Sequence, residues 1–298
     1  MKGQDYTFRT KVETRSDGLE ISHRHKVVML GSCFTDNIGQ RMLNAGFQCL
    51  VNPLGTLYNP LSIHGVMQAS PSLSWLHSKV VDSAASLVDL QRTLHTADVL
   101  IVTFGTAYVY SLKSTGEVVA NCKKMPADLF DRRRVSFDEI ADLWIDFLTK
   151  PAENGGVDGS SIPSVVFTVS PIRHLKDGLH ENQLSKATLL MAIDRICHAL
   201  PGRCHYFPAY EIMLDELRDY RFYADDMMHP SDLAVDYIWT RFCQTYMNAK
   251  TIDFIERFER LNRNLQHRPS DAESPEYIEF INTTNNQLRI LKDAVQNQ

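Results

Sequence analysis

The sequence predicts an α/β fold, a three-layer α/β/α sandwich with a central parallel sheet and additional C-terminal helices. Short apolar stretches alternate with helical patterns along the chain, which favours parallel strands covered by helices. With 298 residues, the chain can bury one large core and still accommodate insertions. Its hydrophobic fraction of 44% and charged fraction of 22% are typical of a globular protein.

The strands and helices of this sandwich are expected in alternating order. Apolar stretches of strand length occur at residues 26–31, 47–51, 98–104, 164–170 and 203–208. Residues 135–148 and 183–200 have the apolar periodicity of helices and lie between consecutive strands.

Two insertions and one extension are expected around this sandwich. Residues 108–122 predict a hairpin after the third strand, because the turn-forming pair Thr115-Gly116 separates two short apolar stretches. Residues 151–163 are rich in Gly and Ser and predict a flexible surface loop. We expect residues 1–250 to form one domain, with residues 251–298 as a helical extension packed on it.

A potential nucleophile follows the first strand, where Ser32 and Cys33 lie before a helical pattern. A side chain at the carboxyl end of a parallel strand faces the crevice where α/β proteins bind ligands. The free N–H groups of the next helix point to the same place, where they can stabilise an oxyanion. They also favour thiolate, so we expect the pKa of Cys33 to be lowered.

A second candidate motif is Asp226-x-x-His229, close to the end of the sandwich. Three residues apart in a helical turn, the two side chains would share one face, and Pro230 fits the first position of a helix. The carboxylate could then hold one ring nitrogen and leave the other free as a base. A nucleophile followed by this pair indicates an ester-cleaving or acyl-transferring enzyme, although a capped turn could produce the same short string.

Arg173 and His174 follow the strand at residues 164–170, at the functional edge of such a sheet. Arg173 could hold an anionic group of a substrate, and His174 could be a second histidine in the pocket. A polar turn around Pro171 is the alternative explanation.

The sequence resembles the GSCFA family, a branch of the SGNH (GDSL-type) hydrolase superfamily. The resemblance spans most of residues 8–247 and lies in five segments, Gly31–Thr35, Asn52–Thr56, Thr103–Ala107, Ser170–His174 and Asp226–Pro230. It implies the SGNH-hydrolase or flavodoxin-like version of the three-layer fold. It also implies an enzyme that hydrolyses esters or moves acyl groups.

The resemblance further implies which residue is the nucleophile. The superfamily motif is Gly-Asp-Ser, and its serine attacks the substrate. Placing this motif on Gly31, Ser32 and Cys33 puts Cys33 at the position of the nucleophile. Ser32 remains the alternative, because serine is the usual nucleophile of the superfamily.

The same resemblance implies an oxyanion hole with one altered position. The N–H group of Gly55 corresponds to one donor of the superfamily. The asparagine that usually supplies another donor is replaced by Ala107, which follows Gly105 and Thr106. Thr106 or Asn52 could supply the missing donor.

The composition and the motifs exclude several other classes. A net charge of −5 argues against a nucleic-acid partner. No apolar stretch is long enough to cross a bilayer, and the polar N-terminus has no signal-peptide core, so a cytoplasmic protein is expected. The cysteines form no Cys-x-x-Cys pair, so neither a metal nor another cofactor is expected.

The sequence therefore predicts a hydrolase of ester, thioester or O-acyl bonds that acts through a Cys33 (or Ser32), His229 and Asp226 triad and a covalent acyl-enzyme. The expected partner is a small-molecule or carbohydrate acyl ester. One alternative is an acyltransferase that passes an acetyl group to a sugar hydroxyl. Another is a non-catalytic binding module on the same fold. The sequence leaves the identity of the substrate and the oligomeric state open.

Overall fold

The computed structural model describes residues 9–68, 83–119, 125–151, 158–266, 271 and 273–296. Its central sheet has five parallel strands in the order β2-β1-β3-β7-β8. This order confirms the predicted fold class, because it is the flavodoxin-like arrangement of a doubly wound sheet. The strands are β1 (Lys26–Gly31), β2 (Gln48–Val51), β3 (Val99–Phe104), β7 (Ser164–Val169) and β8 (Cys204–Phe207).

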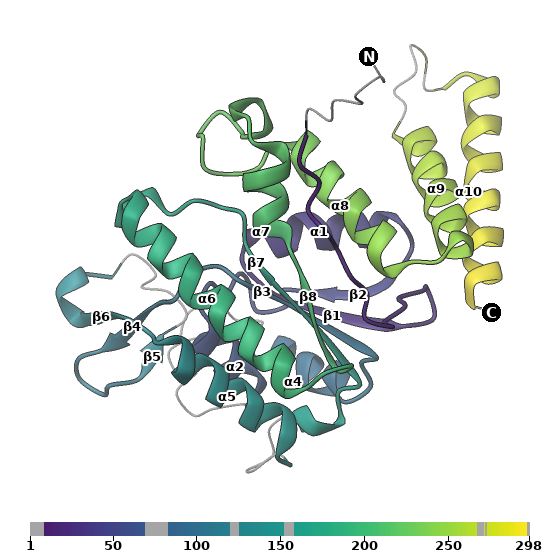
Figure 1. The fold of residues 1–298 in the computed structure, drawn as a ribbon. Coiled ribbons are helices and arrows are strands. Elements are labelled where there is room, and N and C mark those ends of the chain that lie inside the picture. Colours follow the sequence, from purple (N-terminus) through teal and green to yellow (C-terminus); the bar gives the residue numbers. More distant parts are fainter. Residues whose placement is uncertain are drawn as a thin grey trace, which may run out of the picture.

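Helices cover both faces of this sheet (Figure 1). One face is covered by α2 (Pro60–Met67), α4 (Ser83–Leu94), α5 (Phe137–Thr149) and α6 (Leu179–Ala199). The other is covered by α1 (Cys33–Asn44), α7 (Ala209–Glu211) and α8 (Asp232–Tyr246). Short helical turns are η2 (Ala127–Leu129), η3 (Gly159–Ser161), η4 (Leu175–Asp177), η5 (Ile212–Leu217) and η6 (Tyr220–Phe222).

The central strands β1 and β3 are almost entirely apolar because both of their faces are buried. Val28 and Leu30 of β1 pack in the cluster under α2, α4, α5 and α6, whereas Val27 and Met29 pack in the cluster under α1 and α8. Alternate residues of a strand point to opposite faces, so a sheet covered on both sides needs apolar residues throughout.

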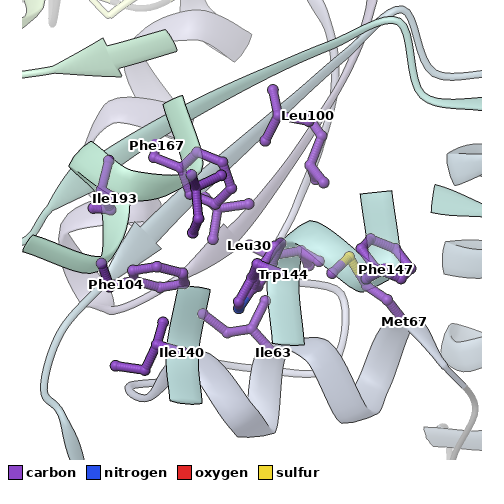
Figure 2. Packing of buried hydrophobic residues seen from close by; sticks show 14 of the residues in the cluster. Leu30, Ile63, Met67, Leu100, Phe104, Ile140, Trp144, Phe147, Phe167 and Ile193 are labelled. Carbon is purple, nitrogen blue, oxygen red and sulfur yellow. The ribbon is translucent and has the colours of Figure 1, made fainter. Parts of the chain in front are cut away.

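Aromatic rings fill the centre of the first of these clusters. The Trp144 ring lies edge-on to Phe104, Phe147 and Phe167, with ring centroids 5.4, 5.9 and 5.3 Å apart respectively. Figure 2 shows this packing between the sheet and the helices that cover it. Edge-to-face contacts at these separations are favourable beyond the area they bury, so they hold α5 firmly against the sheet.

The predicted hairpin belongs to a second, antiparallel sheet with the order β5-β4-β6. β4 (Tyr108–Leu112) pairs with β5 (Val118–Val119) as expected, and residues 120–122 of the predicted span lie outside the described residues. The third strand, β6 (Phe130–Arg134), was not predicted, because four of its five residues are charged and exposed. This small sheet extends from the end of β3 beside α6 (Figure 1).

Other boundaries differ from the expected ones by a few residues. α5 begins at Phe137 with Ser136 as its cap, and α6 begins at Leu179, four residues earlier than predicted. Residues 152–157 of the predicted loop at 151–163 lie outside the described residues, and Gly159–Ser161 forms a short helical turn.

The C-terminal part forms two helices, α9 (Ala249–Leu265) and α10 (Pro275–Gln296), which pack on each other (Figure 1). The Phe258 ring of α9 also fills the space beside Gly46, just after α1, where a Cβ on that glycine would lie 2.6 Å from the ring. Across the described residues, no helix is both long enough and apolar enough to cross a membrane.

Candidate active site

The candidate site lies where the strand order reverses, between the carboxyl ends of β1 and β3. Ligands of doubly wound sheets bind at this switch point. A pocket of about 440 Å³ opens here, beside the loops that follow β1, β3 and β7. Its lining includes six of the predicted site residues, Ser32, Cys33, Thr106, Arg173, His174 and His229.

The turn after β1 requires glycine at position 31. Gly31 has φ +151°, and a Cβ there would lie only 2.4 Å from the carbonyl oxygen of Thr103 on β3. Its N–H group donates to the side-chain oxygen of Asn52 at 2.9 Å. This tight passage brings the chain directly from β1 into α1, so Cys33 is the first residue of the helix.

Cys33, His229 and Asp226 lie in line at the pocket. The sulfur of Cys33 is 3.8 Å from Nε2 of His229, and Nδ1 of His229 is 2.6 Å from Oδ2 of Asp226. An ionised carboxylate can only accept hydrogen bonds, so Asp226 accepts the hydrogen bond of the Nδ1–H group. The other ring nitrogen, Nε2, then has no proton, and its lone pair is directed to the sulfur of Cys33. The structure therefore brings together the three residues that the sequence analysis predicted as nucleophile, base and orienting acid.

The other oxygen of Asp226 shapes the loop that holds His229. Oδ1 accepts the N–H groups of Met228 and His229, each at 2.9 Å. These two N–H groups, and then the His229 ring, lower the pKa of Asp226 to about 2. Asp226 is therefore a carboxylate throughout the neutral range.

The expectation that Asp226 and His229 share a helical turn was wrong. The segment is a non-helical turn with Met227 in the left-handed region at φ 58°, and α8 begins only after Ser231, its N-cap. Pro230 thus precedes the helix and is not its first residue. The two side chains still meet because an aspartate that accepts N–H groups two and three residues ahead folds the chain back on itself.

The expected lowering of the Cys33 pKa was also wrong. Burial raises the pKa of the Cys33 thiol, and the negative charge of Asp36 acts in the same direction. The N–H groups of Cys33 and Phe34 and the charge of Lys186 oppose this effect without cancelling it. The N–H groups at the start of the helix are thus insufficient to lower the pKa of this thiol.

Ser32 has a different position from Cys33. Its hydroxyl accepts the N–H group of Phe34 at 3.3 Å and caps the start of α1, and the residue is buried. Nε2 of His229 contacts the sulfur of Cys33. The geometry therefore favours the thiol of Cys33 over the hydroxyl of Ser32.

The sequence profile of the GSCFA family matches residues 26–84 and 77–242, which include both halves of this site. The chain belongs to the GSCFA family. A search of curated proteins found no match. Among solved structures, the chain is similar to LAE5, described as an alpha/beta hydrolase enzyme from the metagenome of Lake Arreo, Spain. The two chains are 10% identical with a TM-score of 0.41, over 76% of this chain and 97% of that one.

The predicted oxyanion donors Gly55 and Asn52 of this GSCFA protein form hydrogen bonds to other residues outside the pocket. The N–H group of Gly55 donates to the carbonyl oxygen of Asn52 at 2.8 Å and closes a turn. The Asn52 side chain accepts from Gly31 and donates to Asp36 at 2.6 Å. Neither Gly55 nor Asn52 lines the pocket, so both expectations fail. These residues fix the turn after β1 instead.

The turn after β3 is also held by hydrogen bonds. The N–H groups of Gly105 and Thr106 both donate to the carbonyl oxygen of Tyr58, at 2.8 and 2.9 Å. A Cβ on Gly105 would lie 2.9 Å from that oxygen and 3.4 Å from the Cβ of Ser32. Close packing of the glycine thus brings the Tyr58-Asn59 segment against the start of α1.

Asn59 is a pocket residue that the sequence analysis missed. It is buried, and its Oδ1 accepts the N–H group of Ser62 at 2.8 Å as the N-cap of α2. This bond fixes the oxygen side of the amide, and Nδ2 donates to no acceptor within the part of the chain described here. The pair Asn59-Pro60, a typical cap followed by a first helical residue, is the signal that could have located it.

Lys186 is the second residue that was missed. It is fully buried on α6, and its Nζ donates to the carbonyl oxygens of Gly105 and Ser170 at 2.6 and 2.7 Å. It therefore ties the end of β3 to the end of β7 beneath the pocket. Burial, and then the charge of Arg173, lower the pKa of Lys186 to about 7.

His174 lines the pocket as a neutral side chain at pH 7. Burial, and then the charge of Lys186, lower the pKa of His174 to about 4. Its backbone N–H donates to the side-chain oxygen of Asn182 at 3.0 Å, which fixes the chain after β7. Within the described ranges, no group of three or more His, Cys, Asp or Glu side chains is arranged to hold a metal ion.

Proposed function

We propose that this GSCFA protein hydrolyses ester, thioester or O-acyl bonds through a covalent acyl-Cys33 intermediate. The observation that carries the proposal is the line of Cys33, His229 and Asp226 beside an open pocket. The resemblance of the family to SGNH hydrolases supports it. The intact geometry argues against a binding module that has lost its chemistry.

In the first half of the reaction, Nε2 of His229 takes the proton from the Cys33 thiol while the sulfur attacks the acyl carbon. Asp226 stabilises the imidazolium that forms. His229 then gives its proton to the leaving oxygen or sulfur, and the C–O or C–S bond of the substrate breaks. The acyl group remains on Cys33 as a thioester.

In the second half, water attacks this thioester while His229 again acts as the base. The proton passes from water to His229 and then to the sulfur, and the carboxylic acid leaves. Nothing is oxidised or reduced in either half, so no cofactor is needed for the balance.

The oxyanion of each tetrahedral intermediate requires donors in the same pocket. We assign this role to the Cys33 N–H group, at the start of α1, and to Nδ2 of Asn59. Asn59 would then replace the asparagine that Ala107 displaces from the superfamily pattern. A preorganised donor of this kind contributes on the order of a hundredfold or more to turnover.

An acyltransferase is the second candidate, favoured by the aromatic lining of the pocket. Tyr58, Tyr108 and Tyr110 all line it, and such rings can pack against the apolar face of a sugar. In this version, a sugar hydroxyl replaces water in the second half of the reaction. The ratio of transfer to hydrolysis, measured with 4-nitrophenyl acetate and added sugars, separates the two candidates.

The nucleophile is tested by trapping the acyl-enzyme. Wild type is mixed with 4-nitrophenyl acetate or an acyl thioester, quenched in acid and analysed by peptide mass spectrometry. We expect the acyl group on the peptide that contains Cys33, and a loss of turnover of about 10³-fold or more in Cys33→Ala. Cys197→Ala, a half-buried cysteine on α6, is the matched control and should keep full activity.

Ser32→Ala gives the decisive comparison. It removes the hydroxyl cap of α1, so it should lower stability by about 1 kcal/mol while acylation of Cys33 continues. Turnover retained in Cys33→Ala and lost in Ser32→Ala would reverse the assignment of the nucleophile. No acylation of either residue by any ester or thioester would refute the proposed hydrolase.

A further inference from the structure

The pocket is cationic although the chain is acidic. The whole chain has a net charge of −5. The charged side chains that line the pocket, leaving its histidines aside, are Arg132, Arg173 and Lys176 against a single carboxylate, Asp177. A local excess of the sign opposite to that of the whole chain indicates attraction of an anionic ligand.

Arg132 and Asp177 satisfy each other. The guanidinium of Arg132 donates to the carboxylate of Asp177 and also lies over the Tyr108 ring, 3.6 Å from its centroid. The charge of Arg132 is therefore already compensated from two sides. Lys176 is exposed at the rim of the pocket, where water solvates its ammonium group.

Arg173 differs from both of these cations. It is half-buried, and its Nε is fully buried without a hydrogen-bond partner. It forms no ion pair with any described residue. A buried donor without a partner destabilises the folded protein, so such a group requires an explanation.

The backbone places Arg173 beside the reacting groups. Arg173 follows the carboxyl end of β7, and its N–H group donates to the carbonyl oxygen of Met228 at 3.2 Å. Met228 immediately precedes His229, and Arg173 and Cys33 line the same pocket. The backbone of Arg173 is thus held next to the loop that presents the catalytic base, and its side chain lines the same pocket.

We propose that Arg173 binds an anionic group of the substrate, so that the natural substrate is an acyl ester or thioester that also contains a carboxylate or phosphate. The planar guanidinium fork matches both groups with two parallel hydrogen bonds. The inference rests on the proposed hydrolase function and specifies its substrate class. The tyrosine-lined part of the pocket then holds the uncharged part of the substrate.

Matched pairs of esters test this subsite. 4-Acetoxybenzoate and 4-acetoxybenzamide place a charged and a neutral group on the leaving side. The 4-nitrophenyl esters of succinic acid and of succinamic acid place a charged and a neutral group on the acyl side. A third pair, 4-acetoxyphenyl phosphate and phenyl acetate, compares a substrate that contains a phosphate with one that does not. In at least one pair, we expect the kcat/KM of wild type to be about 10- to 100-fold higher for the anionic ester than for the neutral ester.

Variants of Arg173 identify the residue responsible. Arg173→Gln should abolish the preference mainly through KM, with neutral esters within about 3-fold of wild type. Arg173→Lys should restore part of it, because an ammonium supplies the charge without the fork. Arg92→Gln removes an arginine charge from the exposed surface and should leave the preference intact. A preference unchanged in Arg173→Gln, or an equal loss with charged and neutral esters, would overturn the proposal.

Alkylation of Cys33 gives a second measurement that does not depend on turnover. Iodoacetate and iodoacetamide have nearly the same shape and differ in charge. We expect Arg173→Gln to slow the reaction of Cys33 with iodoacetate and to leave that with iodoacetamide unchanged. If no ester is cleaved but this charge dependence holds, the hydrolase proposal fails and the anion subsite stands. If esters are cleaved with no charge dependence in either assay, the subsite fails and the hydrolase stands.

Discussion

Replacing Lys186 by methionine should remove a pH dependence of stability that this buried lysine creates. Lys186 has no carboxylate within ion-pair distance in the described part of the chain, and burial lowers its pKa to about 7. An unfolded lysine titrates near 10.4. Between these two values the unfolded chain binds more protons than the folded one, so stability rises as pH increases through this range.

The size of the effect follows from the two pKa values. A full difference of one proton changes the free energy of unfolding by about 1.4 kcal/mol per pH unit, and at pH 7 about half of this slope applies. From pH 7 to 8.5, the wild type should therefore gain roughly 1 to 2 kcal/mol from Lys186.

Other groups also titrate in this window, but they act equally in wild type and variant, so the difference between the two isolates Lys186. Burial lowers the pKa of His64 and His174 to about 4, so these side chains add a slope of the same sign, which fades about one pH unit above their unfolded value of about 6.5. Burial raises the pKa of Cys49, Cys197 and Cys204 to about 12. These thiols ionise in the unfolded chain at about pH 8.5 and add a slope of the opposite sign, which grows towards the upper end of the window.

The assay is urea unfolding at pH 7.0 to 8.5 under constant ionic strength and with a reductant. Lys186→Met leaves the carbonyl oxygens of Gly105 and Ser170 without their donor, which lowers stability by about 1–3 kcal/mol at every pH. The readout is therefore the difference in the free energy of unfolding between wild type and Lys186→Met, which should grow by roughly 1 to 2 kcal/mol from pH 7.0 to 8.5. Lys150→Met, an exposed lysine paired with Asp146, is the control that should keep the wild-type slope. Equal slopes in wild type and Lys186→Met would refute the argument.

Three further variants test the site and the turn that builds it. Asn59→Asp retains the oxygen that caps α2 but removes the Nδ2 donor, so kcat should fall by about 100-fold or more with little change in melting temperature. Unchanged turnover in this variant would exclude Asn59 from the oxyanion hole. Asp226→Asn keeps the loop hydrogen bonds but no longer fixes the ring tautomer of His229, and steady-state kinetics should show a fall of about 10³- to 10⁴-fold in kcat. In Gly31→Ala, the new Cβ would lie 2.4 Å from Thr103, so urea unfolding should show a loss of at least about 2 kcal/mol. Gly65→Ala, in α2 with open space around its Cβ, should be at least as stable as wild type.

Local patterns in the sequence were sufficient for the sheet and for two parts of the site. The five parallel strands were predicted because each is a short and mostly apolar stretch, as expected where the sheet is covered on both faces. Cys33 at the start of a helix followed from the strand, the glycine and the helical periodicity around it. The pair of Asp226 and His229 was also local, although an aspartate-stabilised turn, and not a helix, brings the two together.

Other features depend on residues far apart in the chain. Cys33 and His229 are 196 positions apart and meet only because β1 and the loop before α8 reach the same edge of the sheet. The donors predicted at Gly55, Asn52, Gly105 and Thr106 are used by neighbouring segments. The Nδ2 of Asn59, a pocket residue, has no acceptor among the described residues.

The pKa values of Cys33 and Lys186 also depend on residues far apart in the chain. A helix N-terminus predicts a lowered pKa for Cys33, but the surrounding elements bury the thiol and raise it. The same burial makes Lys186 a weak base, although nothing in the pattern of its helix distinguishes it from a solvated lysine. Secondary structure follows from neighbours along the chain. The availability of a donor and the charge of a side chain depend on solvation and on partners from other elements, which only the assembled fold brings into place.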